Sequence, residues 1–90
     1  MKVTVFVKIF GIVQGVFYRK STYDKATELG LKGWVRNCED GSVEAVFEGE
    51  ESTVEQILDW CHQGPERARV SGVEVSPMNT SDEFVDFTIL

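Results

Sequence analysis

The order in which two kinds of apolar spacing follow one another constrains the fold of this chain most. Apolar residues at every second position predict a strand, and apolar residues three or four positions apart predict a helix. The chain opens with an alternating apolar run: Val3, Val5, Val7 and Ile9. Residues 18–29 have helical spacing instead, carried by Thr22, Ala26 and Leu29. We therefore expect a first strand with one buried face, followed by a helix that ends at Gly30.

Two further strand-like runs, residues 32–38 and 42–48, are joined by Glu39-Asp40-Gly41. An Asp-Gly pair favours a hairpin because both positions tolerate positive φ. The second run alternates between Val43, Ala45 and Phe47 on one face and Ser42, Glu44 and Glu48 on the other. We expect the second of these faces to be wet, with Glu44 and Glu48 too far apart for a paired-carboxylate site.

A second helix is predicted over residues 53–62. Ser52 and Glu55 have the spacing of a capping box. The apolar stripe of this helix is Val54, Ile57, Leu58 and Cys61. Two more strand-like runs follow on either side of the polar segment 78–83: Val70, Val73 and Val75, then Val85, Phe87 and Ile89.

The predicted order is β, α, β, β, α, β with a short additional strand at the C-terminal end. Helices with one apolar stripe and strands with one apolar face are buried best in two layers. We therefore predict an α+β fold of the ferredoxin-like, split βαβ (βαββαβ) kind, with two helices on one face of a mostly antiparallel sheet. A length of 90 residues suits one core, so residues 1–90 are expected to form a single domain.

Composition limits the partners. The net charge of −6 argues against nucleic acid as a partner, because polyanions are bound chiefly by clusters of Lys and Arg. No apolar run is long enough to span a bilayer, and no membrane partner is expected. Cys38, Cys61 and His62 lack the spacing of a zinc site, so neither a metal nor another cofactor is expected. We expect reduced cysteines, a cytoplasmic location without a secretion signal, and a monomer.

The stretch GIVQGVFYR, residues 11–19, is a candidate anion site between the first strand and the first helix. The first amides of a helix lack partners within the helix, and its dipole is positive there. Gly11 and Gly15 allow the loop to curl so that its N–H groups converge. Arg19 follows in the first turn, where a cation is unfavourable unless it holds an anion. A plain turn with a solvated arginine explains the same residues, so a second converging group is needed.

Asn37, in GWVRN before the hairpin, is the candidate for that second group. An asparagine at such a position ordinarily forms a turn with its own backbone. Other conspicuous side chains have structural interpretations: Trp34, Phe47 and Trp60 as packing residues, His62 as a helix-end residue, and Arg67 and Arg69 as solvated loop residues.

Two motifs carry a family resemblance. In GIVQGVFYR the matching residues are Gly11, Val13, Gln14, Gly15, Val16, Tyr18 and Arg19. In GWVRNCEDGSVEAVFEG they are Gly33, Trp34, Val35, Asn37, Gly41, Val43 and Gly49. In this order and at this separation they closely resemble the paired signatures of the acylphosphatase family, and the similarity extends through GPERARVSGVEV.

The resemblance implies hydrolysis of the carboxyl-phosphate bond of small acyl phosphates to a carboxylate and inorganic phosphate. It implies two catalytic residues, Arg19 to bind the phosphate and Asn37 to orient the attacking water. The substrate-binding loop would then be Gln14, Gly15, Val16, Phe17, Tyr18 and Arg19. It also implies the ferredoxin-like fold.

These residue types suit the reaction. An acyl phosphate has a good leaving group, so positioning and charge stabilisation can supply most of the acceleration without a metal. The guanidinium of Arg19 can meet two phosphoryl oxygens in a fixed fork. Asn37 can accept a hydrogen bond from water but cannot act as a base, and no protein base is evident. We expect a phosphoryl oxygen to take the proton.

Two other functions fit a chain of this kind. A similar βαββαβ scaffold binds single-stranded RNA through sheet aromatics, and Phe6 could serve so, but Glu44 and Glu48 stand where aromatic and basic residues would be needed. A degenerate acylphosphatase-like domain used for protein contacts is the other alternative. The intact Arg19 and Asn37 argue against it.

Overall fold

The structure is a computed structural model of the chain and describes residues 1–79 and 84–90. Its elements are, in chain order, β1 (Lys2–Ile12), α1 (Tyr18–Glu28), β2 (Lys32–Asn37), β3 (Val43–Glu50), α2 (Glu51–Gln63), β4 (Arg69–Pro77) and β5 (Phe87–Ile89). This order confirms the one predicted from apolar spacing, including the short C-terminal strand. The predicted polar segment 78–83 lies outside the described residues from position 80 onward.

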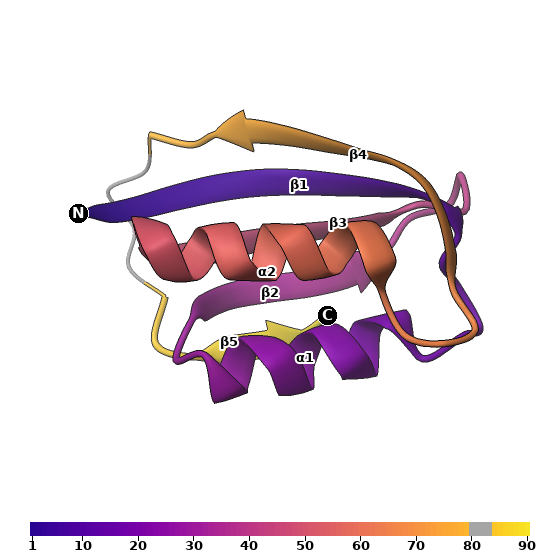
Figure 1. The fold of residues 1–90 in the computed structure, drawn as a ribbon, viewed down its shortest axis with the longest axis horizontal. Helices are drawn as coiled ribbons and strands as arrows, with labels where there is room; N and C mark the ends of the chain where they lie inside the picture. Colours follow the sequence, from indigo (N-terminus) through magenta and orange to yellow (C-terminus); the bar gives the residue numbers. More distant parts are fainter. Residues whose placement is uncertain (80–83) are drawn as a thin grey trace.

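One sheet contains these strands in the order β4-β1-β3-β2-β5. β1 pairs antiparallel with β3 and β4, and β2 pairs antiparallel with β3, whereas β5 lies parallel to β2. Both helices cover the same face of this sheet (Figure 1). The predicted ferredoxin-like α+β fold, with a mostly antiparallel sheet, is therefore confirmed.

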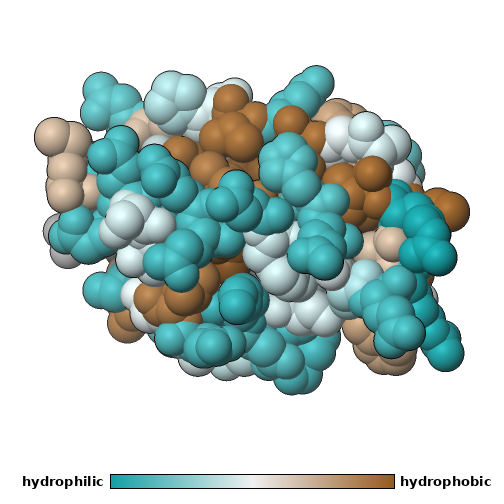
Figure 2. All heavy atoms as spheres, viewed as in Figure 1, coloured by the Kyte–Doolittle hydropathy of each residue, from teal (hydrophilic) through white to brown (hydrophobic). Residues whose placement is uncertain are grey.

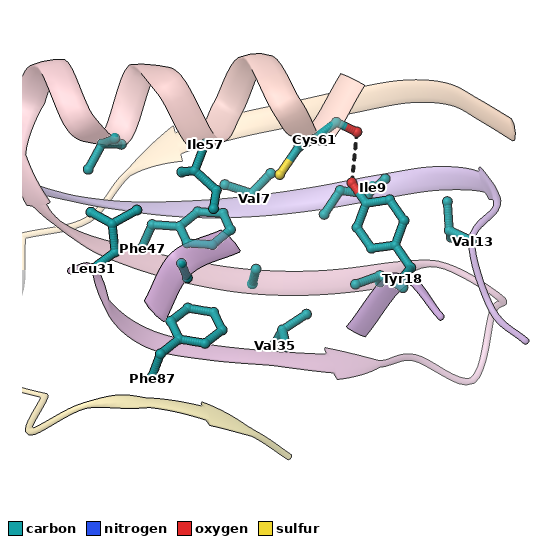
Figure 3. Packing of buried hydrophobic residues seen from close by; sticks show 14 of the residues in the cluster. Val7, Ile9, Val13, Tyr18, Leu31, Val35, Phe47, Ile57, Cys61 and Phe87 are labelled. Atoms are coloured by element: carbon teal, nitrogen blue, oxygen red, sulfur yellow. Dashed lines mark hydrogen bonds between the residues drawn. The ribbon is translucent and has the colours of Figure 1, made fainter. Parts of the chain in front are cut away.

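The core lies between the helices and the sheet. Ile57 and Cys61 of α2 approach Val7 of β1 and Phe47 of β3 across this space (Figure 3), and all four are buried. Full burial of a large aliphatic or aromatic side chain stabilises the fold by about 1.5–3 kcal/mol. The apolar stripes read from the sequence thus hold the two layers together.

The predicted capping box at Ser52 and Glu55 is wrong. α2 begins at Glu51 with Glu50 as its N-cap, so Ser52 lies inside the helix, and no side chain caps it. The reason is tertiary: β3 passes into α2 without a loop, and the amide of Glu51 donates to the carbonyl oxygen of Met1 at 2.9 Å. The Glu50 carboxylate accepts a 2.7 Å hydrogen bond from the N-terminal ammonium.

The expectation of a wetter outer face on the run 42–48 is also wrong, because Ser42 and Glu48 are only 3% and 4% exposed. β3 is the central strand, so neighbours cover it from both sides. Val46, on the same face, is paired with Phe6 of β1 and Trp34 of β2, whose ring centroids are 6.5 Å apart. Glu48 accepts a hydrogen bond from the hydroxyl of Thr4. Burial on the face away from the helices comes from these neighbouring side chains.

The last apolar run is shorter as a strand than its alternation suggests. Val85 lies outside β5 and is exposed, whereas Phe87 is buried against Phe47 with ring centroids 5.7 Å apart. Ile89 stays partly exposed at the end of the chain. The strand pairs with Gly33, Trp34 and Val35 of β2, and the buried ring of Phe87 anchors it to the core.

Three connections gather at one end of the molecule, on the right in Figure 1: the β1–α1 loop, the β2–β3 turn and the α2–β4 connection. The view in Figure 2 shows hydrophobic side chains in separate patches among hydrophilic ones. Within the described residues, no helix combines the length and apolar character needed to cross a membrane.

Candidate active site

The loop before α1 presents backbone N–H groups. Gly15 has φ +75° and Phe17, the N-cap of α1, has φ +66°, so the chain turns sharply into the helix. The first helical bond in this turn runs from the amide of Ser21 to the carbonyl oxygen of Phe17. The amides of residues 15–20 donate to no acceptor among the described residues. They lie at the positive end of the α1 dipole, where an anion is stabilised.

A pocket of about 360 Å³ opens at this loop. Its lining residues are Val13, Gly15, Phe17, Tyr18, Arg19, Lys20, Asn37 and Ile89. The structure therefore brings Arg19 of α1 and Asn37 of β2 to one pocket. Of the six loop residues predicted to bind substrate, Gln14 and Val16 are not among the lining residues.

Asn37 is the last residue of β2 and shares the helix-facing side of that strand with the buried Val35. Its side-chain oxygen, Oδ1, is buried and has no hydrogen-bond partner among the described residues. An acceptor buried without a partner costs about 1–3 kcal/mol. A water or a substrate group bound in the pocket would remove that cost.

The guanidinium of Arg19 is exposed and forms no hydrogen bond or ion pair with any described residue. Its five N–H donors are therefore available to a ligand. The neighbouring Lys20 differs, because its ammonium lies 2.7 and 2.9 Å from the two carboxylate oxygens of Asp24. Arg19 is the cation of this pocket without a protein partner among residues 1–79 and 84–90.

The side chain of Gln14 binds the hairpin instead of the pocket. Its Nε2 donates to the carbonyl oxygens of Cys38 and Ser42, both at 2.8 Å. These carbonyls belong to the β2–β3 turn that follows Asn37 directly. Gln14 therefore connects the loop to the strand that carries Asn37, and both of its side-chain N–H donors are used in this connection.

Tyr18 anchors the start of α1. Its buried hydroxyl donates a 2.7 Å hydrogen bond to the carbonyl oxygen of Cys61 (Figure 3). Burial raises the pKa of Tyr18, so the phenol keeps its proton. Burial also raises the pKa of Cys61 to about 12, which makes its thiol a poor nucleophile. Sequence reasoning assigned Tyr18 to the loop and missed this bond. The hydroxyl that distinguishes tyrosine from phenylalanine was a signal, because a buried hydroxyl usually has a hydrogen-bond partner.

Comparison with known proteins identifies the family. The family model Acylphosphatase matches residues 5–89. The chain belongs to the acylphosphatase family. The prediction from the two motifs is thereby confirmed, and the protein is a member of a hydrolase family.

Individual acylphosphatases support the same conclusion. The chain is 51% identical over 86 residues to an acylphosphatase of Methylococcus capsulatus, covering 96% of this chain and 94% of that protein. It is 48% identical over 89 residues to one of Geotalea uraniireducens, covering 99% and 98%. The solved structure of an acylphosphatase from Coxiella burnetii matches with a TM-score of 0.94 at 37% identity, covering 99% of this chain and 93% of that one.

The pocket at the β1–α1 loop is lined by no Asp, Glu, His or Cys among the described residues. His62 is exposed at the end of α2, and Arg67 is exposed in the loop that precedes β4. The expectation that Arg69 is a loop residue is wrong, because Arg69 is the first residue of β4, and its guanidinium donates to the carbonyl oxygens of Glu66 and Ala68. Asp40 binds the hydroxyl and amide of Ser42 and the ammonium of Lys8, which lower its pKa to about 2. Sequence reasoning did not place three of the lining residues in the site: Val13, Lys20 and Ile89. Val13 and Lys20 are sequence neighbours of the predicted loop, whereas nothing local to the last strand indicates that Ile89 will reach it.

Proposed function

We propose that this acylphosphatase hydrolyses small acyl phosphates in the pocket between the β1–α1 loop and the end of β2. The observation that carries the proposal is the presence of Arg19 and Asn37, from separate elements, in one pocket beside unpaired loop amides. The products are a carboxylate and inorganic phosphate.

Phosphate binding is the task of Arg19 and the loop. The guanidinium contacts two phosphoryl oxygens, and amides of residues 15–20 donate to the remaining oxygens. The net charge of −6 does not prevent this, because charges beyond about 8 Å are largely screened at physiological salt. The guanidinium and the loop amides, which lie within this distance, therefore determine whether the phosphate group binds.

Asn37 positions the water. Its Oδ1 accepts a hydrogen bond from the water and directs the lone pair of the water oxygen toward phosphorus. A bond forms between that oxygen and phosphorus, and the bond from phosphorus to the carboxyl oxygen breaks. The electron pair leaves with the carboxylate, and the proton of the water passes to a phosphoryl oxygen.

The reaction is proposed to need neither a metal nor another cofactor. The carboxylate leaves readily without protonation, and the positive charge of Arg19 together with the amide dipoles stabilises the transferring phosphoryl group. Among the described residues no group of three or more His, Cys, Asp or Glu side chains could hold a metal ion.

The test is a hydrolysis assay with benzoyl phosphate beside 4-nitrophenyl phosphate, a phosphate monoester, with and without EDTA. We expect hydrolysis of benzoyl phosphate, competitive inhibition by inorganic phosphate, little hydrolysis of the monoester, and no effect of EDTA. An inactive enzyme, or one equally active on the monoester, would contradict the substrate class. Strong inhibition by EDTA would contradict the metal-free mechanism.

We further propose that residues 1–90 act as one domain, as a monomer in the cytoplasm, with neither nucleic acid nor membrane as a partner. Cys38 and Cys61 are both free, which suits a reducing compartment. Sedimentation equilibrium should give the mass of one chain, and urea unfolding should show one cooperative transition. An unchanged mobility of single-stranded RNA in a gel shift would remove the RNA-binding alternative.

A further inference from the structure

Phe17 is a bulky residue in a backbone conformation that favours glycine. Its φ of +66° lies in the left-handed region, which a side chain with a Cβ adopts only at a steric cost. Core packing does not offset this cost, because Phe17 is 69% exposed. Its ring also lies against no other aromatic ring of the described residues. The side chain therefore needs a reason outside the folded core.

The position of Phe17 supplies that reason. It lines the pocket that Arg19 and Asn37 line, and so does Ile89 of β5, which is 38% exposed. Two exposed apolar side chains from separate elements thus lie beside the phosphate-binding donors. Any acyl group is joined to the phosphate through a single oxygen, so it must lie next to the loop that holds the phosphate. A pocket of about 360 Å³ has room for both parts of such a substrate.

Charge in the pocket favours an uncharged acyl group. Besides Arg19, the cation among the lining residues is Lys20. Its ammonium is paired with both carboxylate oxygens of Asp24. An acyl group with its own carboxylate would have to compete with Asp24 for this lysine, whereas an apolar group meets Phe17 and Ile89 without competition.

We infer that Phe17 and Ile89 form the acyl-group subsite and that the preferred substrates are acyl phosphates with an uncharged aromatic or large aliphatic acyl group. This inference rests on the proposed function of the same pocket. The Phe17 backbone carries an amide of the phosphate loop and its ring binds the acyl group, so one residue sets the distance between the two subsites.

The test compares kcat/KM for benzoyl phosphate, acetyl phosphate and succinyl phosphate among four enzymes. These are the wild type, Phe17→Asn, Ile89→Ala and Val75→Ala. Asparagine tolerates positive φ, so Phe17→Asn removes the ring while keeping the backbone conformation. Val75, 44% exposed on the edge strand β4, is a control matched to Ile89 in exposure. Intrinsic reactivity cancels when the benzoyl-to-acetyl ratio is compared between enzymes.

We expect this ratio to fall by about fivefold to tenfold in Phe17→Asn and by about twofold to threefold in Ile89→Ala, as the loss of a one-sided apolar contact implies. It should stay unchanged in Val75→Ala. In the wild type, phenylphosphonate should inhibit about tenfold more tightly than methylphosphonate, a measurement that needs no variant.

An unchanged ratio in both Phe17→Asn and Ile89→Ala, with active enzymes, would overturn the subsite and leave the proposed function standing. A preference for succinyl phosphate over benzoyl phosphate would overturn the uncharged substrate class. A wild-type enzyme that hydrolysed none of the three would overturn the proposed function and the subsite together.

Discussion

The hydroxyl of Tyr18 and the carbonyl oxygen of Cys61 lie 2.7 Å apart, although 43 positions separate them in the chain. The helical donor for this carbonyl would be the amide of residue 65, which is a proline and has no N–H. Tyr18 supplies the missing donor. Gly64 allows the approach, because a Cβ there would lie 2.7 Å from the tyrosine ring. The hydrogen bond to the end of α2 thus fixes Tyr18, whose neighbours in the chain are Phe17 and Arg19.

Tyr18→Phe should lower the free energy of unfolding by about 1–2 kcal/mol, because it leaves the Cys61 carbonyl without a partner in the core. Urea unfolding followed by circular dichroism measures this. Tyr23→Phe is the control, since the half-buried Tyr23 hydroxyl makes no hydrogen bond with the described residues. Equal stability losses in the two variants would contradict a specific role for the bond.

Gln14→Ala should impair both stability and catalysis. It removes the two 2.8 Å hydrogen bonds to the Cys38 and Ser42 carbonyls, and we expect a loss of about 1–3 kcal/mol in unfolding free energy. The loop would also lose its attachment to the strand of Asn37, so kcat should fall. Gln56→Ala, at an exposed position of α2, should change neither. An unaltered kcat in Gln14→Ala would show that the loop holds its shape without this connection.

Arg19→Lys should fold with an unchanged melting temperature, because the guanidinium has no protein partner among the described residues. Its kcat/KM for benzoyl phosphate should fall by about 100-fold or more, since an ammonium cannot reproduce the two parallel hydrogen bonds. The inhibition constant of inorganic phosphate should rise in parallel. Arg67→Lys, in the exposed loop before β4, serves as the control. Phosphate inhibition that survived the change undiminished would argue against Arg19 as the phosphate ligand.

Asn37→Ala should lower kcat by about 100-fold with a small change in KM, because it removes the acceptor that we propose to orient the water. Stability should not decrease, since Oδ1 has no protein partner among the described residues to lose. Asn37→Asp keeps the shape but adds a negative charge beside the phosphate, so its KM should rise as well. Wild-type turnover in Asn37→Ala would rule out the water-orienting role.

Asp40→Asn should destabilise the protein at pH 7 and much less at pH 2. The hydroxyl and amide of Ser42 and the ammonium of Lys8 lower the pKa of Asp40 from 3.8 to about 2 in the folded state. A lowered pKa means that the carboxylate stabilises the fold fully above about pH 4 and that this contribution is lost as the pH falls through about 2. Melting temperatures of both proteins between pH 7 and pH 2 measure the effect. A difference that persisted undiminished at pH 2 would point to a cause other than the charge.

Much of the fold could be predicted because its information is local. Alternation in residues 3–9 and 42–48 and the Asp40-Gly41 turn need only neighbouring residues to be read. The glycines of the first loop and the start of α1 at Tyr18 are local in the same sense. Arg19 and Asn37 were found through two motifs, and their presence in one pocket agrees with the roles predicted for them.

Other features depend on parts of the chain that are distant in sequence. Helix α2 begins at Glu51 instead of at a capping box because β3 runs directly into it and the carbonyl oxygen of Met1 accepts a hydrogen bond from the Glu51 amide. Glu48 is buried because β3 became the central strand of the sheet. In both cases the outcome depends on contacts with segments distant in sequence, which a local pattern does not describe.

The sequence by itself determined the order of strands and helices, the curled loop and the chemical groups available at it, since backbone preferences and apolar periodicity act over a few residues. Only the tertiary structure decided that Gln14 binds the β2–β3 turn, that Tyr18 completes the end of α2, and that Ile89 reaches the pocket. The physical reason is that a hydrogen bond or an apolar contact between distant segments forms only after packing of the two layers has brought them together.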